Sequence, residues 1–355
     1  MNTFLMSQYL SYIIVYFLLA FFLAFWLFPV YIHLLKKLGV GQKIRESAVD
    51  GKKAEIFKKL HTHKWWVPSL GWGMFLFVTG ILVLLSLILV KWGIINNSLI
   101  SRQETYILLF AFFFMGWLGL VDDLFNYFGK SKVKGLTAKA KLAWMIIFAF
   151  FISWWFYFKL GISTVNLWPF LPEINLGFGY FLLTFLFTLA LVNAVNITDG
   201  LDGLAGGISL FVLLVLGVYS FWVWWYLATT LLMVVAAVLL AFLWFNIPPA
   251  KIFMGDSWAL ALGGLMAATI YLLDNRVPIF VPSLFLLGIF WAELLTSFLQ
   301  LSRKKIFKKK LFPIAPLHHW LEFLGYPEYN IVGRMWLIQI VLSLIAILFL
   351  LFWLG

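Results

Sequence analysis

The sequence contains no cysteine and few charged residues. Of its 355 residues, 11% are charged and 64% are hydrophobic, and 39 are phenylalanine and 19 tryptophan. Without cysteine the chain forms neither disulfides nor thiolate metal sites. A soluble core does not hide this much apolar surface, whereas a bilayer accepts it. The composition therefore excludes an ordinary soluble domain.

Apolar runs recur along the whole chain, and a membrane-spanning helix needs roughly 20 mostly apolar residues. The pattern predicts an all-α polytopic membrane protein that forms one integral membrane domain over residues 1–355. Lys36 is the first lysine, so no basic segment precedes the first apolar run, and this run is expected to stay as an anchor. About ten helices are predicted near residues 9–35, 70–92, 105–121, 140–159, 177–196, 204–221, 223–245, 257–273, 277–302 and 331–354.

Two of these boundaries depend on local signals. The sixth and seventh helices share one apolar stretch, which is divided at Trp222, Trp224, Trp225 and Tyr226 because these residue types favour the membrane interface. The eighth and ninth helices are divided at residues 274–276, where Asp-Asn-Arg followed by proline indicates a tight turn.

Lysine and arginine predict the orientation. Alternate loops at residues 36–69, 122–141, 197–203, 246–256 and 303–334 hold 22 of the 26 basic residues. The positive-inside rule makes these loops cytoplasmic and places both termini outside. The net charge of +12 is then a property of membrane topology, and no nucleic-acid partner is expected.

Acidic residues and histidines gather on the same face. All five histidines and ten of the fourteen carboxylates lie on or beside the cytoplasmic loops. A phosphoryl-transfer site is therefore expected at this surface. Of the four other carboxylates, Glu293 is the one clear charge in the middle of a span, the ninth predicted one. It either borders a groove for a lipid phosphate or makes buried hydrogen bonds.

The segment from residue 193 to residue 204 carries the strongest polar pattern. Asn193, Asn196, Asp199 and Asp202 recur at every third residue, so successive polar groups share a face at a helix end. Gly200 would allow the backbone to approach a ligand closely. The alternative reading is a plain polar loop between two helices.

Three further carboxylates lie at predicted helix ends. Asp122 and Asp123 are adjacent and repel each other, so a cation or a proton is expected between or beside them. Asp256 begins the eighth span and suits Mg²⁺, which takes one or two carboxylates together with substrate phosphates. The alternatives are a stop signal at the membrane surface and a favourable position near the N-terminus of a helix.

The first and last cytoplasmic loops add groups that bind anions. His318 and His319 follow a proline and a basic run, and they suit phosphate or nucleotide binding. Zinc is a weaker alternative, because neither cysteine nor His-x-x-x-His spacing supports a closed site. Lys64 and Ser69 flank a Trp- and Pro-containing turn that also fits an interfacial anchor.

Taken together, these motifs resemble the polyprenyl-phosphate N-acetylhexosamine-1-phosphate transferase superfamily, and within it the phospho-N-acetylmuramoyl-pentapeptide transferases of peptidoglycan synthesis. The resemblance runs from about residue 61 to residue 336. It depends on Asp122-Asp123, residues 193–204, Leu243-Trp-Phe-Asn246, Phe253-Met-Gly-Asp256 and Ala315-Pro-Leu-His318-His319 with Glu322. It implies ten transmembrane helices around a cleft that faces the cytoplasm of a bacterial inner membrane.

The resemblance also implies a reaction. Undecaprenyl phosphate attacks UDP-MurNAc-pentapeptide with Mg²⁺ and gives lipid I and UMP, directly or through an aspartyl-phosphate; a homodimer is compatible with the family. Asp256 would bind the metal and Asp122 would deprotonate the lipid phosphate, with Asp123, Asp199, His318 and His319 as further catalytic groups. The implied substrate contacts are Gly200, Leu201, Asp202 and Phe253 around uracil, Lys64, Ser69, Asn196, Asp199 and Asn246 around ribose and phosphate, and Asn193, Lys139 and Lys141 beside them.

Four positions depart from the usual family pattern: Trp72 and Trp258 replace glycines, Asn126 replaces a lysine, and Trp320 replaces a third histidine. Two other functions stay open. The same chemistry on UDP-GlcNAc is one, although that branch typically carries His-x-His-His in the last loop. The other is a non-catalytic transporter or lipid-handling protein, which would be expected to show internal repeats or interrupted helices, and the sequence shows neither.

Overall fold

The computed structural model describes residues 3–39, 67–69, 71–128 and 136–355. Within this part of the chain, nine helices are long and apolar enough to cross a membrane, and one bent pair counts as a tenth span. The predicted all-α membrane protein is confirmed. The elements are α1 (Thr3–Lys37), α3 (Trp72–Lys91), α4 (Gln103–Phe128), α5 (Ala138–Trp154) with a π-helical turn (Trp155–Lys159), β1 (Thr164–Asn166), β2 (Glu173–Asn175), α6 (Phe178–Thr198), α7 (Leu204–Trp222), α8 (Tyr226–Asn246), α9 (Gly255–Asp274), α10 (Phe280–Leu286), α11 (Gly288–Phe307), α12 (Leu317–Phe323) and α13 (Glu328–Leu354).

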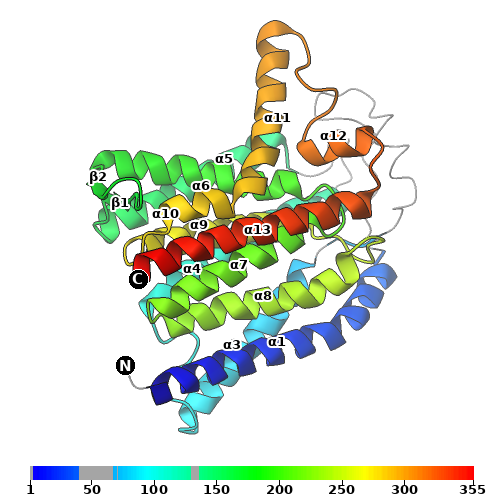
Figure 1. Ribbon diagram of the computed structural model, residues 1–355. Helices are drawn as coiled ribbons and strands as arrows, with labels where there is room; N and C mark the ends of the chain where they lie inside the picture. Colours follow the sequence, from blue (N-terminus) through cyan, green and yellow to red (C-terminus); the bar gives the residue numbers. More distant parts are fainter. Residues whose placement is uncertain (1–2, 40–66, 70, 129–135) are drawn as a thin grey trace.

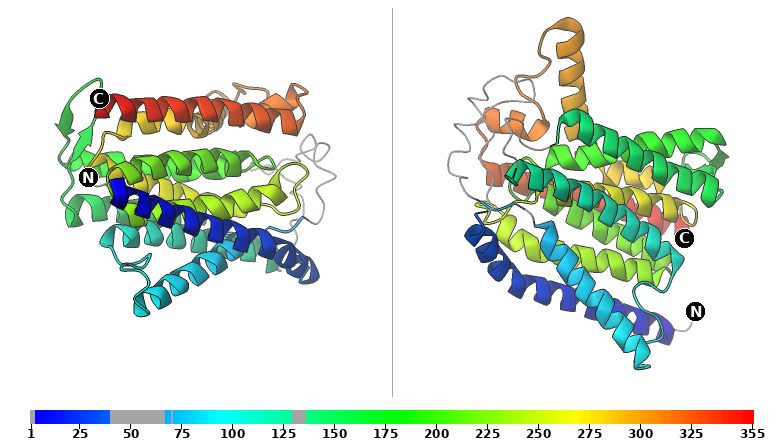
Figure 2. Two further views of the ribbon diagram at one scale, coloured as in Figure 1. Left: turned by 60° about the horizontal axis from the view of Figure 1, so that its bottom comes forward. Right: turned by 180° about the vertical axis from the view of Figure 1, so that it is seen from behind.

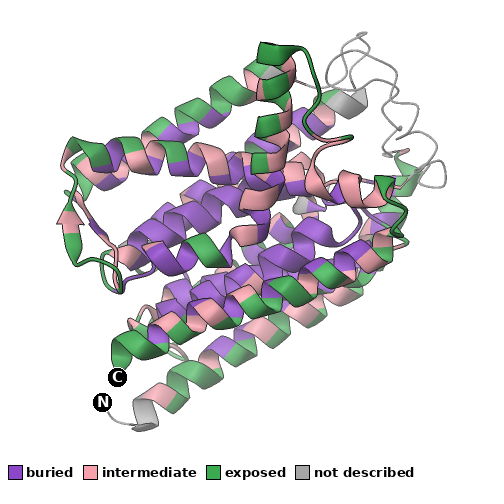
Figure 3. Ribbon diagram, turned by 45° about the horizontal axis from the view of Figure 1, so that its top comes forward, coloured by how far each residue is buried: buried purple, intermediate pink, exposed green. Residues whose placement is uncertain are grey.

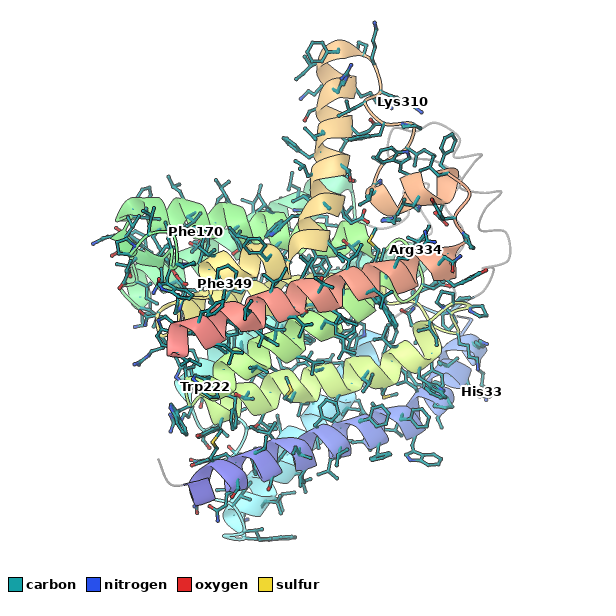
Figure 4. All side chains as sticks on the ribbon, viewed as in Figure 1. His33, Phe170, Trp222, Lys310, Arg334 and Phe349 are labelled. Atoms are coloured by element: carbon teal, nitrogen blue, oxygen red, sulfur yellow. The ribbon has the colours of Figure 1, made fainter. Side chains whose placement is uncertain are left out.

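The long helices form one bundle, and the two termini lie at the same end of it (Figure 1). An even number of crossings requires this arrangement. Figure 4 shows Trp222 and Phe349 near that end, whereas His33 and Arg334 lie at the opposite end. The predicted division between the sixth and seventh spans is confirmed, because α7 ends at Trp222 and α8 begins at Tyr226.

The helix α9 forms the centre of the bundle. In its most apolar window 94% of the residues are buried, against 28% in α1 and 22% in α13. Figure 3 shows the same gradient, with buried residues in the middle of the bundle and exposed ones on the outer helices. The outer faces of α1 and α13 are the surfaces that the apolar composition assigns to lipid. The first turn of α9 is less buried than the rest of this helix, since Gly255 and Asp256 are partly exposed.

The ninth predicted span is wrong as a continuous helix. It is divided at Leu287 into α10 and α11, which meet at 70°. In Figure 1 and in the right-hand view of Figure 2 the helix α11 stands away from the bundle. The break leaves the Leu286 carbonyl without its helical partner, and the Gln339 side chain of α13 donates a hydrogen bond of 2.9 Å to it. Interrupted helices are tolerated in membranes where neighbouring groups satisfy the backbone in this way.

A short hairpin at the end of the bundle that carries the termini was also missed. Strands β1 and β2 pair antiparallel, with Val165 opposite Ile174. Asp274, the last residue of α9, accepts hydrogen bonds from the Asn166 N–H in β1 and from the Phe280 N–H that begins α10. The predicted turn after Asp274 is confirmed, and its carboxylate joins three elements.

Candidate active site

Helix α4 lies directly against the first turn of α9 because Gly119 has no side chain. A Cβ at this position would collide with the backbone of Asp256 and Ser257. The close approach places Asp122 and Asp123, one turn further along α4, beside the start of α9. Residues that are more than 130 positions apart in sequence thereby share one site.

The adjacent carboxylates of α4 have different surroundings. Asp123 accepts hydrogen bonds from the Ser257 hydroxyl at 2.7 Å and from the Ser257 N–H at 3.2 Å. Asp122 is 2% exposed, and it accepts a hydrogen bond of 2.6 Å from the Leu136 N–H. Asp123 is thus tied to α9 by neutral donors, whereas Asp122 also faces the ammonium of Lys141.

The ammonium of Lys141 joins two of the carboxylates. Its Nζ lies 2.9 Å from Asp122 Oδ2, and it also forms an ion pair with Asp256 Oδ2. The other oxygen of Asp256 accepts a hydrogen bond of 2.6 Å from the Asn196 amide of α6. Side chains from α4, α5, α6 and α9 therefore converge on one point, at which Asp256 is the common partner.

Asp199 follows directly after α6 and lies near the carboxylates of Asp123 and Asp256. Burial raises the pKa of its carboxyl well above the ordinary value, and the negative charges of Asp256, Asp123 and Asp202 raise the pKa further. The Gly255 N–H at the start of α9 works in the opposite direction. A concentration of carboxylates at one buried end of the bundle is unfavourable without cations. The site is therefore built to receive positive charge.

The same carboxylates fit a magnesium ion. Among the described residues, no three His, Asp or Glu side chains group as a complete metal site. Asp122 and Asp256 nevertheless converge on a single cation, the ammonium of Lys141. Mg²⁺ commonly takes one or two carboxylates and completes its shell with water and substrate phosphates. These two residues match that requirement.

Both predicted histidines lie on α12. His319 Nδ1 is 2.7 Å from Glu322 Oε2. His318 is buried, and its Nδ1 is 3.0 Å from Glu293 Oε2 on α11. Of the two roles expected for Glu293, the buried hydrogen-bonded one is confirmed. The His318 ring lies against Gly200, where a Cβ would collide with Nε2.

Two asparagines predicted to bind substrate form hydrogen bonds with backbone groups instead. Asn246 accepts a hydrogen bond of 3.0 Å from the Gly203 N–H and donates one of 2.8 Å to the Ile252 carbonyl. It thereby fixes the two loops that flank the site. Asn193 donates to the Leu189 carbonyl of its own helix and does not join the group around Asp256.

The remaining predicted residues lie around this centre. Leu201 is buried in the turn before α7, and Lys139 is exposed two residues before Lys141 on α5. The Phe253 N–H donates to the Pro68 carbonyl at 2.8 Å, so the segment that carries Ser69 lies beside the loop before α9. Lys64 lies outside the described residues.

A pocket of about 470 Å³ opens next to Asp202. The Asp202 carboxylate accepts a hydrogen bond of 3.1 Å from the Ala250 N–H, and its own N–H donates to Glu328 Oε1 at 2.7 Å. Sequence reasoning missed Glu328, although a carboxylate that begins a span directly after proline was a signal. The pocket is lined by Asp202, Pro248, Pro249, Glu322, Gly325, Tyr326, Pro327, Glu328 and Tyr329.

Two of the unusual tryptophans have described side chains, and they do not point at the carboxylates. Trp258 is fully buried among Phe75, Phe112 and Phe242 in the helix core. Trp320 packs on Phe312, with 5.2 Å between ring centroids. The side chains of the third unusual tryptophan, Trp72, and of Asn126 are not among those described. Trp258 therefore packs in the helix core and not against the carboxylates.

Comparison with known proteins agrees with this geometry. Residues 105–274, which contain Asp122, Lys141, Asp199 and Asp256, match the model of glycosyl transferase family 4. Fold and site together define a membrane-embedded glycosyl transferase of that kind.

The relatives identify the family more closely. A phospho-N-acetylmuramoyl-pentapeptide-transferase of Clostridium perfringens strain SM101 is 35% identical over 322 residues, which cover 90% of this chain and 91% of the relative. Proteins of the same name from Geobacillus sp. strain WCH70 and Oceanobacillus iheyensis are 33% and 32% identical, over 90% of this chain and 92% of each relative. The chain belongs to the phospho-N-acetylmuramoyl-pentapeptide-transferase family.

Proposed function

We propose that the protein transfers phospho-MurNAc-pentapeptide from UDP-MurNAc-pentapeptide to undecaprenyl phosphate. An oxygen of the lipid phosphate forms a bond to the sugar-bearing phosphorus of the UDP-sugar. The bond from that phosphorus to UMP breaks, and UMP leaves with the electron pair. The products are lipid I and UMP. Family membership supports this reaction, and the observation that carries it is the convergence of Asp122, Lys141 and Asp256 on one point.

Each residue of the site would have its own role in the reaction. Asp122 removes a proton from the lipid phosphate, and the Lys141 ammonium neutralises phosphate charge as the new bond forms. Asp123, together with Asp199 once its carboxyl has released its proton, adds negative charge that binds cations. The nucleotide contacts in this proposal are Gly200, Leu201, Asp202 and Phe253 for uracil, and Lys64, Ser69, Asn196, Asp199 and Asn246 for ribose and phosphates. Asn193, Lys139, His318 and His319 lie beside them along the cleft.

Magnesium belongs to this proposal. Asp256 would hold the ion, with Asp122 nearby. When bound, Mg²⁺ supplies positive charge that stabilises the pyrophosphate and the leaving UMP. Asn196 supports Asp256 through its amide, which keeps one carboxylate oxygen in a fixed direction.

We also propose that this end of the bundle faces the cytoplasm of the bacterial inner membrane, with residues 1–355 acting as one transferase domain. The support is the distribution of lysine and arginine, 22 of 26 of which lie in the loops of that side. A soluble UDP-sugar would then meet a lipid phosphate at the membrane surface.

To test the proposed reaction, purified protein with undecaprenyl phosphate and Mg²⁺ is incubated separately with UDP-MurNAc-pentapeptide and with UDP-GlcNAc, and UMP release is measured. Release of UMP from the first substrate alone is expected. Release from UDP-GlcNAc alone would assign the protein to the GlcNAc-1-phosphate branch instead. No UMP from either, together with substrate flux in proteoliposomes, would favour a transporter and contradict the proposal.

A further inference from the structure

One ring nitrogen of His318 is buried without a partner among the described residues. This Nε2 atom makes no hydrogen bond there, although its ring is only 1% exposed. It lies over the Cα of Gly200, at the turn between α6 and α7. A buried polar atom without a partner destabilises the folded state. The nitrogen is therefore in place for a ligand atom that reaches this turn.

The other ring nitrogen is held by Glu293. This carboxylate is fully buried on α11, and both of its oxygens face α12. Oε2 lies 3.0 Å from His318 Nδ1, and Oε1 accepts a hydrogen bond of 3.2 Å from the His318 backbone N–H. A carboxylate that is held by a backbone donor presents its second oxygen as an acceptor, so Nδ1 carries a hydrogen. The ring can then turn only Nε2 toward Gly200.

We propose that Glu293 is a positioning residue, which fixes the His318 ring so that Nε2 meets a phosphate oxygen of the bound nucleotide. This inference rests on the proposed function, because the phosphate belongs to the UDP-sugar. With a phosphate on one side and a carboxylate on the other, both ring nitrogens donate hydrogen bonds. Glu293 touches no reacting atom, and it acts through His318.

A purely structural clip between α11 and α12 is the competing explanation, and the chain contains a matched control for it. Gln300 lies two turns further along α11 and binds the segment that leads to α12. Its side chain accepts hydrogen bonds of 2.9 Å from the Leu311 and Phe312 N–H groups and donates one of 2.9 Å to the Phe312 carbonyl. Gln300→Ala therefore weakens the same connection without touching His318.

The first test is a double-mutant cycle on UMP release, with Glu293→Gln, His318→Ala, the double variant and Gln300→Ala. Glu293→Gln is expected to lower kcat/KM about 10–100-fold, the range found when a partner that orients a metal-binding histidine is removed. In the His318→Ala background it should add nothing. Gln300→Ala should lower Tm and keep near wild-type turnover. Equal losses from Glu293→Gln in both backgrounds, or losses that simply follow Tm, would overturn the inference.

The second test does not need turnover. Histidine labelled with ¹⁵N gives few ring signals in a chain with five histidines, and His318→Ala identifies those of residue 318. With UMP and Mg²⁺, both ring nitrogens of His318 should be protonated in the wild type and not in Glu293→Gln. Identical spectra would refute the role of Glu293. If the wild type releases no UMP from any UDP-sugar, the proposed function fails, whereas an active wild type matched by Glu293→Gln sinks this inference alone.

Discussion

Replacing Lys141 by methionine removes the ammonium between Asp122 and Asp256 and keeps most of the side-chain length. Loss of one partner from a buried ion pair costs about 3–5 kcal/mol. Asp122 is 2% exposed, but the side chains of Lys141 and Asp256 are 18% and 21% exposed. Because water reaches two of the three groups, we expect the lower end, about 3 kcal/mol less stability.

Thermal unfolding of the purified protein in EDTA and in Mg²⁺ checks this expectation. A ligand at 100 times its Kd stabilises the native state by about 2.7 kcal/mol. Mg²⁺ should therefore restore much of the stability that Lys141→Met loses. It should raise the Tm of this variant more than that of the wild type, because it binds between two carboxylates that have lost their ammonium partner. The control is Lys139→Met, one exposed position on the same turn of α5. A Lys141→Met protein as stable as wild type in EDTA, with the same response to Mg²⁺, would refute the electrostatic reasoning.

Three further outcomes follow from the structure. Since the pKa of Asp199 is raised, the native state holds a proton that the unfolded chain releases, and stability falls as pH rises through that pKa. Asp199→Asn should thus raise Tm at pH 8, although turnover is lost. The rise in Tm should vanish below about pH 4, where Asp199 is protonated in both the folded and the unfolded state. A rise in Tm that does not depend on pH speaks against this cause. Gly200→Ala should displace His318 and lower turnover about 100-fold, since misplacement by 1 Å has that effect, whereas Gly80→Ala, which meets open space, should keep wild-type turnover. Gln339→Ala leaves the Leu286 carbonyl unpaired and should cost about 1–3 kcal/mol in thermal unfolding; an unchanged Tm contradicts the account of the helix break.

The helical architecture could be predicted from sequence because its signals are local. Apolar length gives the spans, and residues that favour interfaces or turns mark their ends, as Trp222 and Asp274 do. The break at Leu287 has no such signal, since its stability depends on Gln339 from a helix 50 residues away. The hairpin of two three-residue strands was too short to stand out from the neighbouring loops.

The candidate site, like the fold, could be predicted from the sequence only in part. Its residue types could be listed from motifs, and most of them lie at one end of the bundle. Their pairing could not be predicted, because Lys141 and Asp256 are 115 positions apart, and because the close packing of α4 on α9 at Gly119 depends on the tertiary fold. Glu293 was noticed as a charge within a span, but its partner His318 depends on the 70° bend between α10 and α11.

The central claim is that Asp256 gathers the cation and the substrate phosphates on which transfer depends. Its most direct test is UMP release from UDP-MurNAc-pentapeptide by Asp256→Ala, over a Mg²⁺ titration, beside the wild type and a thermal-unfolding check of folding. The account predicts that Mg²⁺-dependent release is abolished at every concentration, because the metal contribution of several kcal/mol corresponds to at least about 100-fold in rate. Wild-type turnover by the folded variant would contradict it.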